Sequence, residues 1–150
     1  MHVVSERELL HPTLRWELPD EAKMVKTAGG SLMVEFVGLL MVRLKNKKGK
    51  WFLVEAPALF VPGMTADTLL SETQLVSCSG CEETKCFGLQ GVRQRVMTED
   101  AEGKRQTIEI EEEQGVFLVH MQGVSCEEMR RRRTIENVHE VKVPKMIKTK

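Results

Sequence analysis

Four cysteines are the residues of this chain whose type and spacing most clearly suggest chemistry. Cys78 and Cys81 are separated by two residues, and Cys86 follows after four more. The two-residue spacing is typical of the knuckle of a structural zinc site, for which His120 and Cys126 are the remaining candidate ligands. We favour reduced cysteines in a glycine-containing loop, and therefore expect no cofactor. Zinc held by Cys78, Cys81, Cys86 and Cys126 is the alternative.

A strand, a tight turn and a short helix are predicted around the middle of the chain. Trp51–Val61 is mostly apolar and partly alternating, and Pro62-Gly63 ends this run as a turn dipeptide. Ser71 and Gln74 have the spacing of a capping box, in which the hydroxyl accepts a hydrogen bond from a helix-start amide. One short helix is therefore expected near residues 71–76.

The same region carries a resemblance to a known family. Eight positions match a signature in order: Val61, Pro62, Gly63, Leu69, Leu70, Ser71, Gln74 and Leu75. Together with weaker matches at residues 27–44 and 115–119, they resemble the protease region of copia-type retrotransposon polyproteins. His2-Val3 resembles the pair that follows the catalytic Asp-Ser-Gly-Ala loop in that family. The resemblance spans residues 2–121 and implies a mostly β fold, a retropepsin-like closed or partly open barrel of hairpins.

A hairpin near the start of the chain would have a role in such a fold. Met24–Thr27 and Leu32–Glu35 flank Ala28–Ser31, and Gly-Gly supplies the positive φ angles that a two-residue hairpin loop needs. The resemblance implies a flap that closes over bound peptide, formed by Thr27, Ala28, Gly29, Gly30 and Ser31. An ordinary surface hairpin without a ligand is the alternative.

The aspartates do not provide the catalytic pair that the family uses. Asp20, Asp67 and Asp100 are the only aspartates, and none is followed by Thr-Gly or Ser-Gly. An aspartic protease holds two carboxylates close enough to share a proton, and the glycine permits the turn that brings them together. Asp67 is expected to be a turn or helix-start residue. The matching loop would lie before Met1, so we assign no catalytic residue and expect no peptidase activity from the chain as given.

Two further hairpins follow from alternation and turn residues. Phe36–Leu44 is an apolar strand in which Gly38 is expected to mark a bend or bulge. Lys45–Lys50 then joins it to the central strand; its lysines are typical of a solvated tip, and phosphate binding is the alternative. Val92–Met97 and Gln106–Glu111 both alternate and are predicted to pair.

The register of this last hairpin can be predicted. Placing Arg95 opposite Glu109 brings opposite charges together on one face and sets Val96 opposite Ile108 on the other. Gly115–Met121 is then expected to be a single apolar strand, with His120 near its end in a structural role.

Composition limits the remaining possibilities. With 150 residues and 41% hydrophobic content, the chain can bury one core, which we assign to residues 1–121. Lys plus Arg and Asp plus Glu both total 22, which excludes an overall charge that would attract nucleic acid. Apolar runs are too short to span a membrane, and the first residues lack the core of a signal peptide. The clustered cysteines favour a reducing, intracellular compartment, the cytoplasm or nucleus.

Residues 122–150 are predicted to be a basic extension, partly disordered or forming an edge strand at Ile135–Val143. Residues 130–150 contain eight Lys or Arg against two Glu. Such a block is typical of a solvated tail. Salt-sensitive contact with nucleic acid through Arg130–Arg133 and the C-terminal lysines is the alternative.

Three functions are therefore open. The first is a truncated or degenerate aspartic protease domain of a retrotransposon polyprotein, inactive as given. The second is a binding or self-assembly module on the same fold, which would form a homodimer or hold a peptide or polyprotein segment. The third is a small zinc-clipped β domain with a basic tail. Resemblance of fold alone does not choose among these uses.

Overall fold

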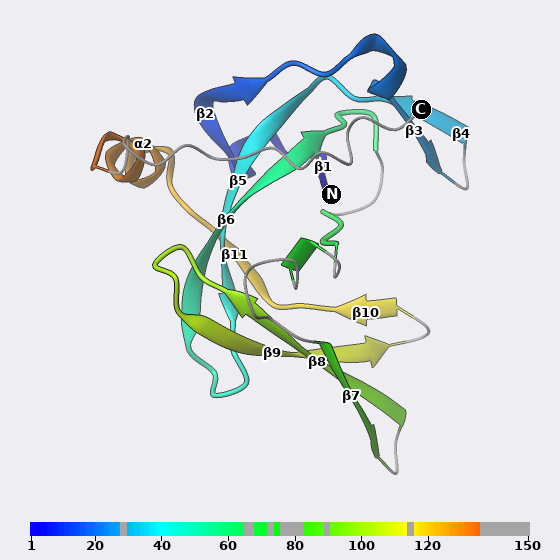
Figure 1. Ribbon diagram of the computed structural model, residues 1–150, viewed down its shortest axis with the longest axis vertical. Coiled ribbons are helices and arrows are strands. Elements are labelled where there is room, and N and C mark those ends of the chain that lie inside the picture. The colour runs from blue at the N-terminus through cyan, green and yellow to red at the C-terminus, as the bar shows by residue number, and fades with distance from the viewer. Residues whose placement is uncertain are drawn as a thin grey trace. The chain divides into compact units, whose positions relative to one another are not determined.

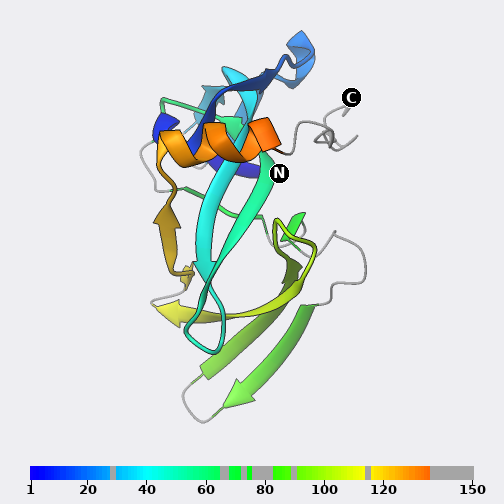
Figure 2. The same cartoon turned by 90° about the vertical axis from the view of Figure 1, so that its left-hand side faces the viewer.

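Strands dominate the computed structural model, as predicted (Figures 1 and 2). The structure describes residues 1–27, 30–64, 68–71, 74–75, 83–88, 91–113 and 116–135. The strands are β1 (His2–Val4), β2 (Leu10–Trp16), β3 (Met24–Thr27), β4 (Gly30–Met33), β5 (Phe36–Lys45), β6 (Trp51–Phe60), β7 (Glu83–Gly88), β8 (Gly91–Glu99), β9 (Arg105–Glu113), β10 (Val116–Leu118) and β11 (Met121–Gly123). Two 3-10 turns, η1 (Arg7–Leu9) and η2 (Asp20–Ala22), and the helix α2 (Cys126–Ile135) accompany these strands, and Gln74 and Leu75 are also helical.

The chain divides into two compact units. The first contains Met1–Met41, Ala56–Ser71 and Val124–Lys150, and the second contains Val42–Glu55 and Glu72–Gly123. Hydrogen bonding orders one sheet as β1-β6-β5-β11, with β2 also paired to β5, and a second as β10-β9-β8-β7; β3 and β4 form a third. None of these sheets of described strands closes on itself, so the closed form of the predicted barrel is not found.

The core of the first unit forms around β5. Phe36–Met41 is buried without interruption, because this strand is covered on both faces and its sequence is accordingly a continuous apolar run rather than an alternating one. Val37 gathers with Leu18, Val34 and Val61 in one cluster of buried side chains. This cluster includes a residue of the family signature, Val61, and holds the end of β6 in place.

Gly38 lies at the irregular point of the β2–β5 ladder. Leu10 pairs with Leu40 and Arg15 pairs with Gly38, so β2 has extra residues between these two pairs. A Cβ atom at Gly38 would lie 3.1 Å from Leu10 Cδ1 and 3.3 Å from Phe36 Cε1. The predicted irregularity is therefore confirmed for the ladder, but the extra residues belong to β2, and the glycine gives Leu10 room to pack.

The extra residues of β2 are held by a histidine side chain. His11 is buried, and its Nδ1 accepts hydrogen bonds from the backbone amides of Thr13 and Leu14, both at 3.2 Å. Arg7 donates to the carbonyl oxygen of Pro12 at 2.8 Å. These contacts satisfy backbone groups that the interrupted ladder leaves without strand partners.

Gly38→Val is expected to lower the free energy of unfolding by about 2 kcal/mol, because the added methyl groups would displace the buried Leu10 and Phe36 side chains. Chemical denaturation measures this change. Gly63→Val is the matched control, since a Cβ there would lie at an ordinary 3.7 Å from Leu32 Cδ2. Equal stability losses for the two variants would contradict the role assigned to Gly38.

In the second unit, the predicted register of β8 and β9 is confirmed. Arg95 lies opposite Glu109, and Val96 lies opposite Ile108. Val96 and Ile108 are both buried, which shows that this face of the hairpin is turned toward the core. The strands extend further than predicted, to Glu99 and Arg105, so that only a short turn joins them.

The single strand predicted at Gly115–Met121 is wrong. The structure has two strands there, β10 and β11, separated by Val119 and His120. Val116 of β10 pairs with Glu113 of β9, whereas Met121 of β11 pairs with Leu44 of β5. The chain thus leaves one sheet and joins another within the mostly apolar stretch 116–121. Hydrophobic pattern alone does not reveal such a change of partner.

Two hairpin turns share one local design. Asn46–Lys50 closes β5 and β6, and Asp100–Lys104 closes β8 and β9; each has an Asx residue first, glycine fourth and lysine fifth. In each turn the Asx Oδ1 accepts hydrogen bonds from two turn amides at 2.9–3.0 Å. Gly49 and Gly103 have φ angles of +81° and +84°, which favour glycine.

Hydrogen bonds connect these two turns. Asn46 Nδ2 donates to Gln106 Oε1 at 3.1 Å, and Gln106 Nε2 donates to Asp100 Oδ2 at 2.9 Å. The backbone amide of Lys47 donates to the carbonyl oxygen of Thr107 at 2.8 Å. The tip of the β5–β6 hairpin is therefore fixed against the start of β9.

Helix α2 was not predicted from the sequence. Ser125 caps it, because its Oγ accepts a hydrogen bond from the Glu128 amide at 3.1 Å, and Glu127 and Glu128 place negative charge in the first turn. Ile135 ends this helix, and the rest of the edge strand predicted at Ile135–Val143 lies outside the described residues. None of the helices described is long and apolar enough to cross a membrane.

Candidate functional site

His2 lies at the centre of the residues that carry the family resemblance. It is fully buried, and its Nδ1 accepts a hydrogen bond from the Ser71 amide at 2.8 Å. Burial, with a smaller effect of the Met1 amino group, lowers the pKa of His2 from 6.5 to about 4. The imidazole is therefore neutral at neutral pH and serves as an acceptor that joins two distant parts of the chain.

Strand β1 is held on both sides. It runs parallel to β6, with His2, Val3 and Val4 opposite Ala58, Leu59 and Phe60. On its other side, Val3 and Leu69 exchange two backbone hydrogen bonds of 2.9 Å each. The fold thus brings the His2-Val3 pair at the start of the chain between the end of β6 and the Leu69–Ser71 segment that follows β6.

The remaining signature positions have structural roles. Val61 is buried, and its amide donates to the carbonyl oxygen of Val4 at 2.8 Å. Pro62-Gly63 forms an exposed turn, as predicted. Gln74 and Leu75 are helical, in agreement with the short helix predicted near residues 71–76; Ser71 is not helical, and residues 72, 73 and 76 lie outside the described residues. In the second unit, Leu75 is buried and its carbonyl oxygen accepts from Thr98 Oγ1 at 2.9 Å.

The hairpin that the resemblance assigns to a flap is formed by β3 and β4. Thr27 pairs with Gly30, and Gly30 has a φ angle of +122°. Gly30 and Ser31 are exposed, whereas the loop residues Ala28 and Gly29 lie outside the described residues. The predicted hairpin is confirmed, but β4 begins at Gly30 rather than at Leu32. Its use as a flap remains a prediction.

The two described aspartates have structural partners. Asp20 Oδ1 lies 3.2 Å from Lys23 Nζ on the surface. The carboxylate of Asp100 accepts hydrogen bonds from Glu102 N, Lys104 N and Gln106 Nε2, all at 2.9 Å. Asp67 lies outside the described residues. Asp100 therefore stabilises its turn, whereas the exposed Asp20 pair contributes little to stability.

The structure describes the predicted zinc ligands only in part. Cys78 and Cys81 lie outside the described residues, and Cys86 lies in β7, opposite Arg93 of β8. Cys126 has a free, exposed thiol at the start of α2. In the described portion, no group of three or more potential metal ligands comes together. The zinc site remains a prediction that needs direct measurement.

Elemental analysis of the purified chain is expected to find substoichiometric zinc, since the nearby residues supply three thiolates rather than the four that structural sites use. One zinc per chain, lost in Cys81→Ser but retained in a surface control such as Ser31→Ala, would contradict this expectation. Cys126→Ser would then show whether that thiol is the fourth ligand.

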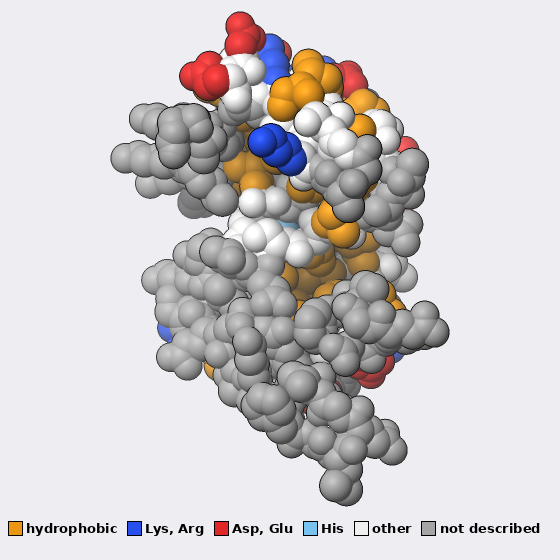
Figure 3. Space-filling view, turned by 90° about the vertical axis from the view of Figure 1, so that its right-hand side faces the viewer, with side chains coloured by type: hydrophobic (Ala, Val, Ile, Leu, Met, Phe, Trp, Pro, Cys, Tyr) orange, Lys and Arg blue, Asp and Glu red, His pale blue; other side chains and the backbone are white. Residues whose placement is uncertain are grey.

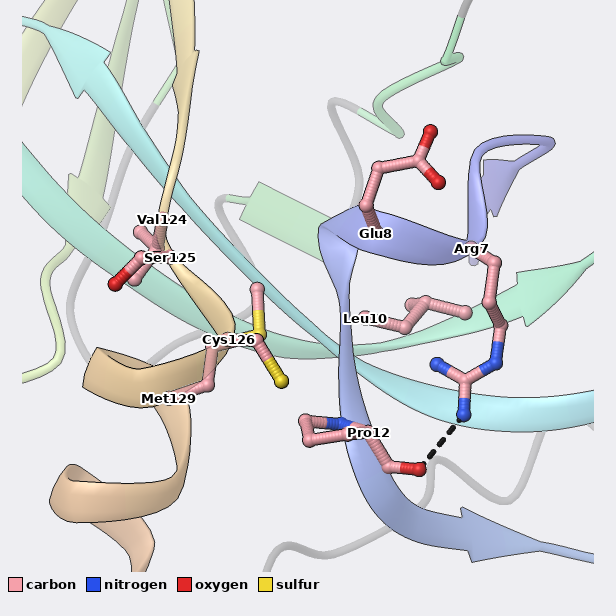
Figure 4. A pocket seen from close by; sticks show the side chains of 8 residues that line it. All are labelled: Arg7, Glu8, Leu10, Pro12, Val124, Ser125, Cys126 and Met129. Carbon is pink, nitrogen blue, oxygen red and sulfur yellow. Dashed lines mark hydrogen bonds between the residues drawn. The ribbon is translucent and has the colours of Figure 1, made fainter.

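A cavity of about 510 Å³ opens in the first unit beside α2. Figure 4 shows its walls: Leu10 and Pro12 from β2 face Cys126 and Met129 from α2, and the Arg7 guanidinium is directed to the Pro12 carbonyl. Among the described residues that line it, Glu8 is the one carboxylate, and there is no histidine. The described lining thus combines one carboxylate, one guanidinium and one thiol with apolar side chains.

Comparisons with known proteins place the chain in no family. No protein-family model matches it, no curated protein matches it, and no solved structure matches it. The arrangement around β1 is therefore interpreted from its own residues.

Proposed function

We propose that this chain is the β-rich, retropepsin-like protease module of a copia-type retrotransposon polyprotein, without a catalytic aspartate of its own. The convergence on β1 carries this proposal. The matching residues His2-Val3, Leu59–Val61 and Leu69–Ser71 were identified by order along the chain, yet they are neighbours in space.

The same geometry indicates where catalytic residues would enter. In the family that the sequence resembles, the Asp-Ser-Gly-Ala loop precedes the histidine, and β1 begins at His2. A loop joined there would start from a buried strand held on both sides, which is a rigid position for a reacting carboxylate. A homodimer would then supply one aspartate from each chain, and the β3–β4 hairpin would cover the peptide.

A gain-of-function experiment tests the proposal. The chain is prepared as given and with an Asp-Ser-Gly-Ala segment joined a few residues before His2, and both are incubated with a degenerate peptide library. We expect pepstatin-sensitive cleavage only by the extended chain, and none after the added aspartate is changed to asparagine. A folded, dimeric extended chain that cleaves nothing would overturn the proposal, as would pepstatin-sensitive cleavage by the chain as given.

A binding or self-assembly module is the second candidate, favoured by exposed methionines on the same hairpin. Met24 and Met33 lie opposite each other on β3 and β4 and are 50% and 59% exposed. Figure 3, which views the molecule from the side where this hairpin lies in Figure 1, shows hydrophobic side chains at the surface. Sedimentation equilibrium would favour this candidate if dimers persist at low concentration and Met24→Lys with Met33→Lys dissociates them. Gln122→Lys, at an exposed position outside this hairpin, is the control for the added charge.

An intracellular location is part of the proposal. Its support is the clustering of Cys78, Cys81 and Cys86, which is typical of a reducing compartment. The zinc-clipped domain with a nucleic-acid-contacting tail remains the third candidate, and elemental analysis decides it.

A further inference from the structure

We propose that a cavity in the second unit, between the β5–β6 turn and the start of β9, binds a phosphate group. This cavity has a volume of about 170 Å³ and is lined by Asn46, Lys47, Lys48, Arg105, Gln106 and Thr107. Three of the six lining residues are cations and none is a carboxylate. The lining therefore attracts an anion.

The fold holds these cations together. Lys47 and Lys48 occupy the turn that Asn46 organises through its hydrogen bonds to the Lys48 and Lys50 amides. Arg105 begins β9, and the Lys47–Thr107 backbone bond joins β9 to that turn. Because backbone contacts fix the positions from which all three side chains extend, little ordering of the chain is needed when a ligand binds.

Glu99 stands opposite Arg105 across β8 and β9 and offsets part of its charge. Within the part of the chain that the structure describes, however, Lys47, Lys48 and Arg105 form no ion pair. The Asp100 carboxylate, which is close in sequence, instead accepts three hydrogen bonds within the turn network. Like charges held close together repel one another, and a bound oxyanion would add attractive interactions with each cation that offset this repulsion.

The size and chemistry of the cavity identify the ligand class. Its volume lies below the range of about 300–1,000 Å³ that is usual for pockets holding drug-sized molecules, so a single small group fits better than a whole nucleotide. Arg105 supplies planar paired donors, and the lysines supply point charges, a combination suited to phosphate oxygens. A phosphate group of a nucleic-acid backbone and that of a small phosphorylated compound share this chemistry.

Two-dimensional ¹H–¹⁵N NMR on the whole chain tests the site. Inorganic phosphate is titrated at constant ionic strength, and a single-stranded oligothymidylate is titrated in parallel. We expect saturable shifts of the Lys47, Lys48, Arg105 and Thr107 amides. Lys48→Gln and Arg105→Gln should each weaken phosphate binding about tenfold, the loss expected for one charge-assisted hydrogen bond. Lys26→Gln, on an exposed strand of the first unit, should leave binding unchanged.

The two arms separate the sources of the phosphate. Tighter binding of oligothymidylate at the same amides, with competition by phosphate, assigns the site to a nucleic-acid backbone. Binding of phosphate without any oligothymidylate effect assigns it to small phosphorylated compounds. The proposal is overturned if phosphate gives no saturable shifts, or if Lys48→Gln and Arg105→Gln leave the titration unchanged while the β8–β9 amide signals confirm that both variants are folded.

Discussion

Replacing Asp100 by asparagine is expected to lower the free energy of unfolding by about 2 kcal/mol, because it places two hydrogen-bond donors against each other. Asn46 Oδ1 accepts from two turn amides, which fixes its Nδ2 as the donor to Gln106 Oε1. Gln106 must then present Nε2 to residue 100, where a carboxylate oxygen accepts it at 2.9 Å. An asparagine side chain has only one acceptor oxygen, and at residue 100 that oxygen would already accept the two turn amides. Its NH2 group would therefore face the Gln106 NH2 group.

The reversed pair provides the matched test of this network. The Asn46→Asp variant alone should also be less stable, since it places a carboxylate oxygen of residue 46 against Gln106 Oε1, and both atoms are acceptors. In the double variant Asn46→Asp with Asp100→Asn, Gln106 can turn its amide over and satisfy both neighbours. We expect the double variant to regain most of the lost stability, with a coupling energy of at least about 1 kcal/mol in denaturant unfolding. Losses that simply add would show that the side-chain network has no role in joining the turns.

Acidification is expected to destabilise the protein through His2 by about 3 kcal/mol between pH 7 and pH 4. The pKa of His2 is about 4 when folded and near 6.5 when unfolded. Above pH 6.5 neither state binds the proton, so the full stability is present. As the pH falls from 6.5 toward 4, only the unfolded state becomes protonated, and the free energy of unfolding decreases.

Two variants isolate this contribution from that of the carboxylates. His2→Asn retains an acceptor near the Ser71 amide but does not titrate, so its unfolding free energy should fall less steeply over this pH range than that of the original chain. His120→Asn is the control, since His120 is exposed and its replacement should leave the steep dependence intact. Parallel pH profiles for His2→Asn and the original chain would contradict the assigned pKa.

The sequence was most informative where local signals agreed. Alternation and charge pairing predicted that Arg95 lies opposite Glu109 because a shift of one residue would have turned Val96 and Ile108 out of the core. The Gly-Gly dipeptide predicted the position of the β3–β4 hairpin, because few other residues accept positive φ angles.

Prediction failed where the structure depends on distant partners. Nothing in Gly115–Met121 marks the change from β9 to β5 as the neighbouring strand. Helix α2 was missed because its four consecutive arginines hide any apolar periodicity; Met129 is its main buried side chain. His2 was singled out by resemblance alone, and its contact with Ser71 could not be inferred from residue types. The repeated Asx-x-x-Gly-Lys pattern at Asn46 and Asp100 was an available signal for the two turns.

Amide hydrogen exchange at Val3, Leu69 and Ser71 tests most directly whether the segments that resemble the protease signature assemble around β1. Each of these amides donates a hydrogen bond within the described structure, to Leu69 O, Val3 O and His2 Nδ1 respectively. We expect all three to exchange far more slowly than in an unstructured peptide, and Ser71 to lose protection in His2→Ala while Val96 retains it. Exchange of the three amides at unstructured rates in a folded chain would contradict the assembly on which the proposed function rests.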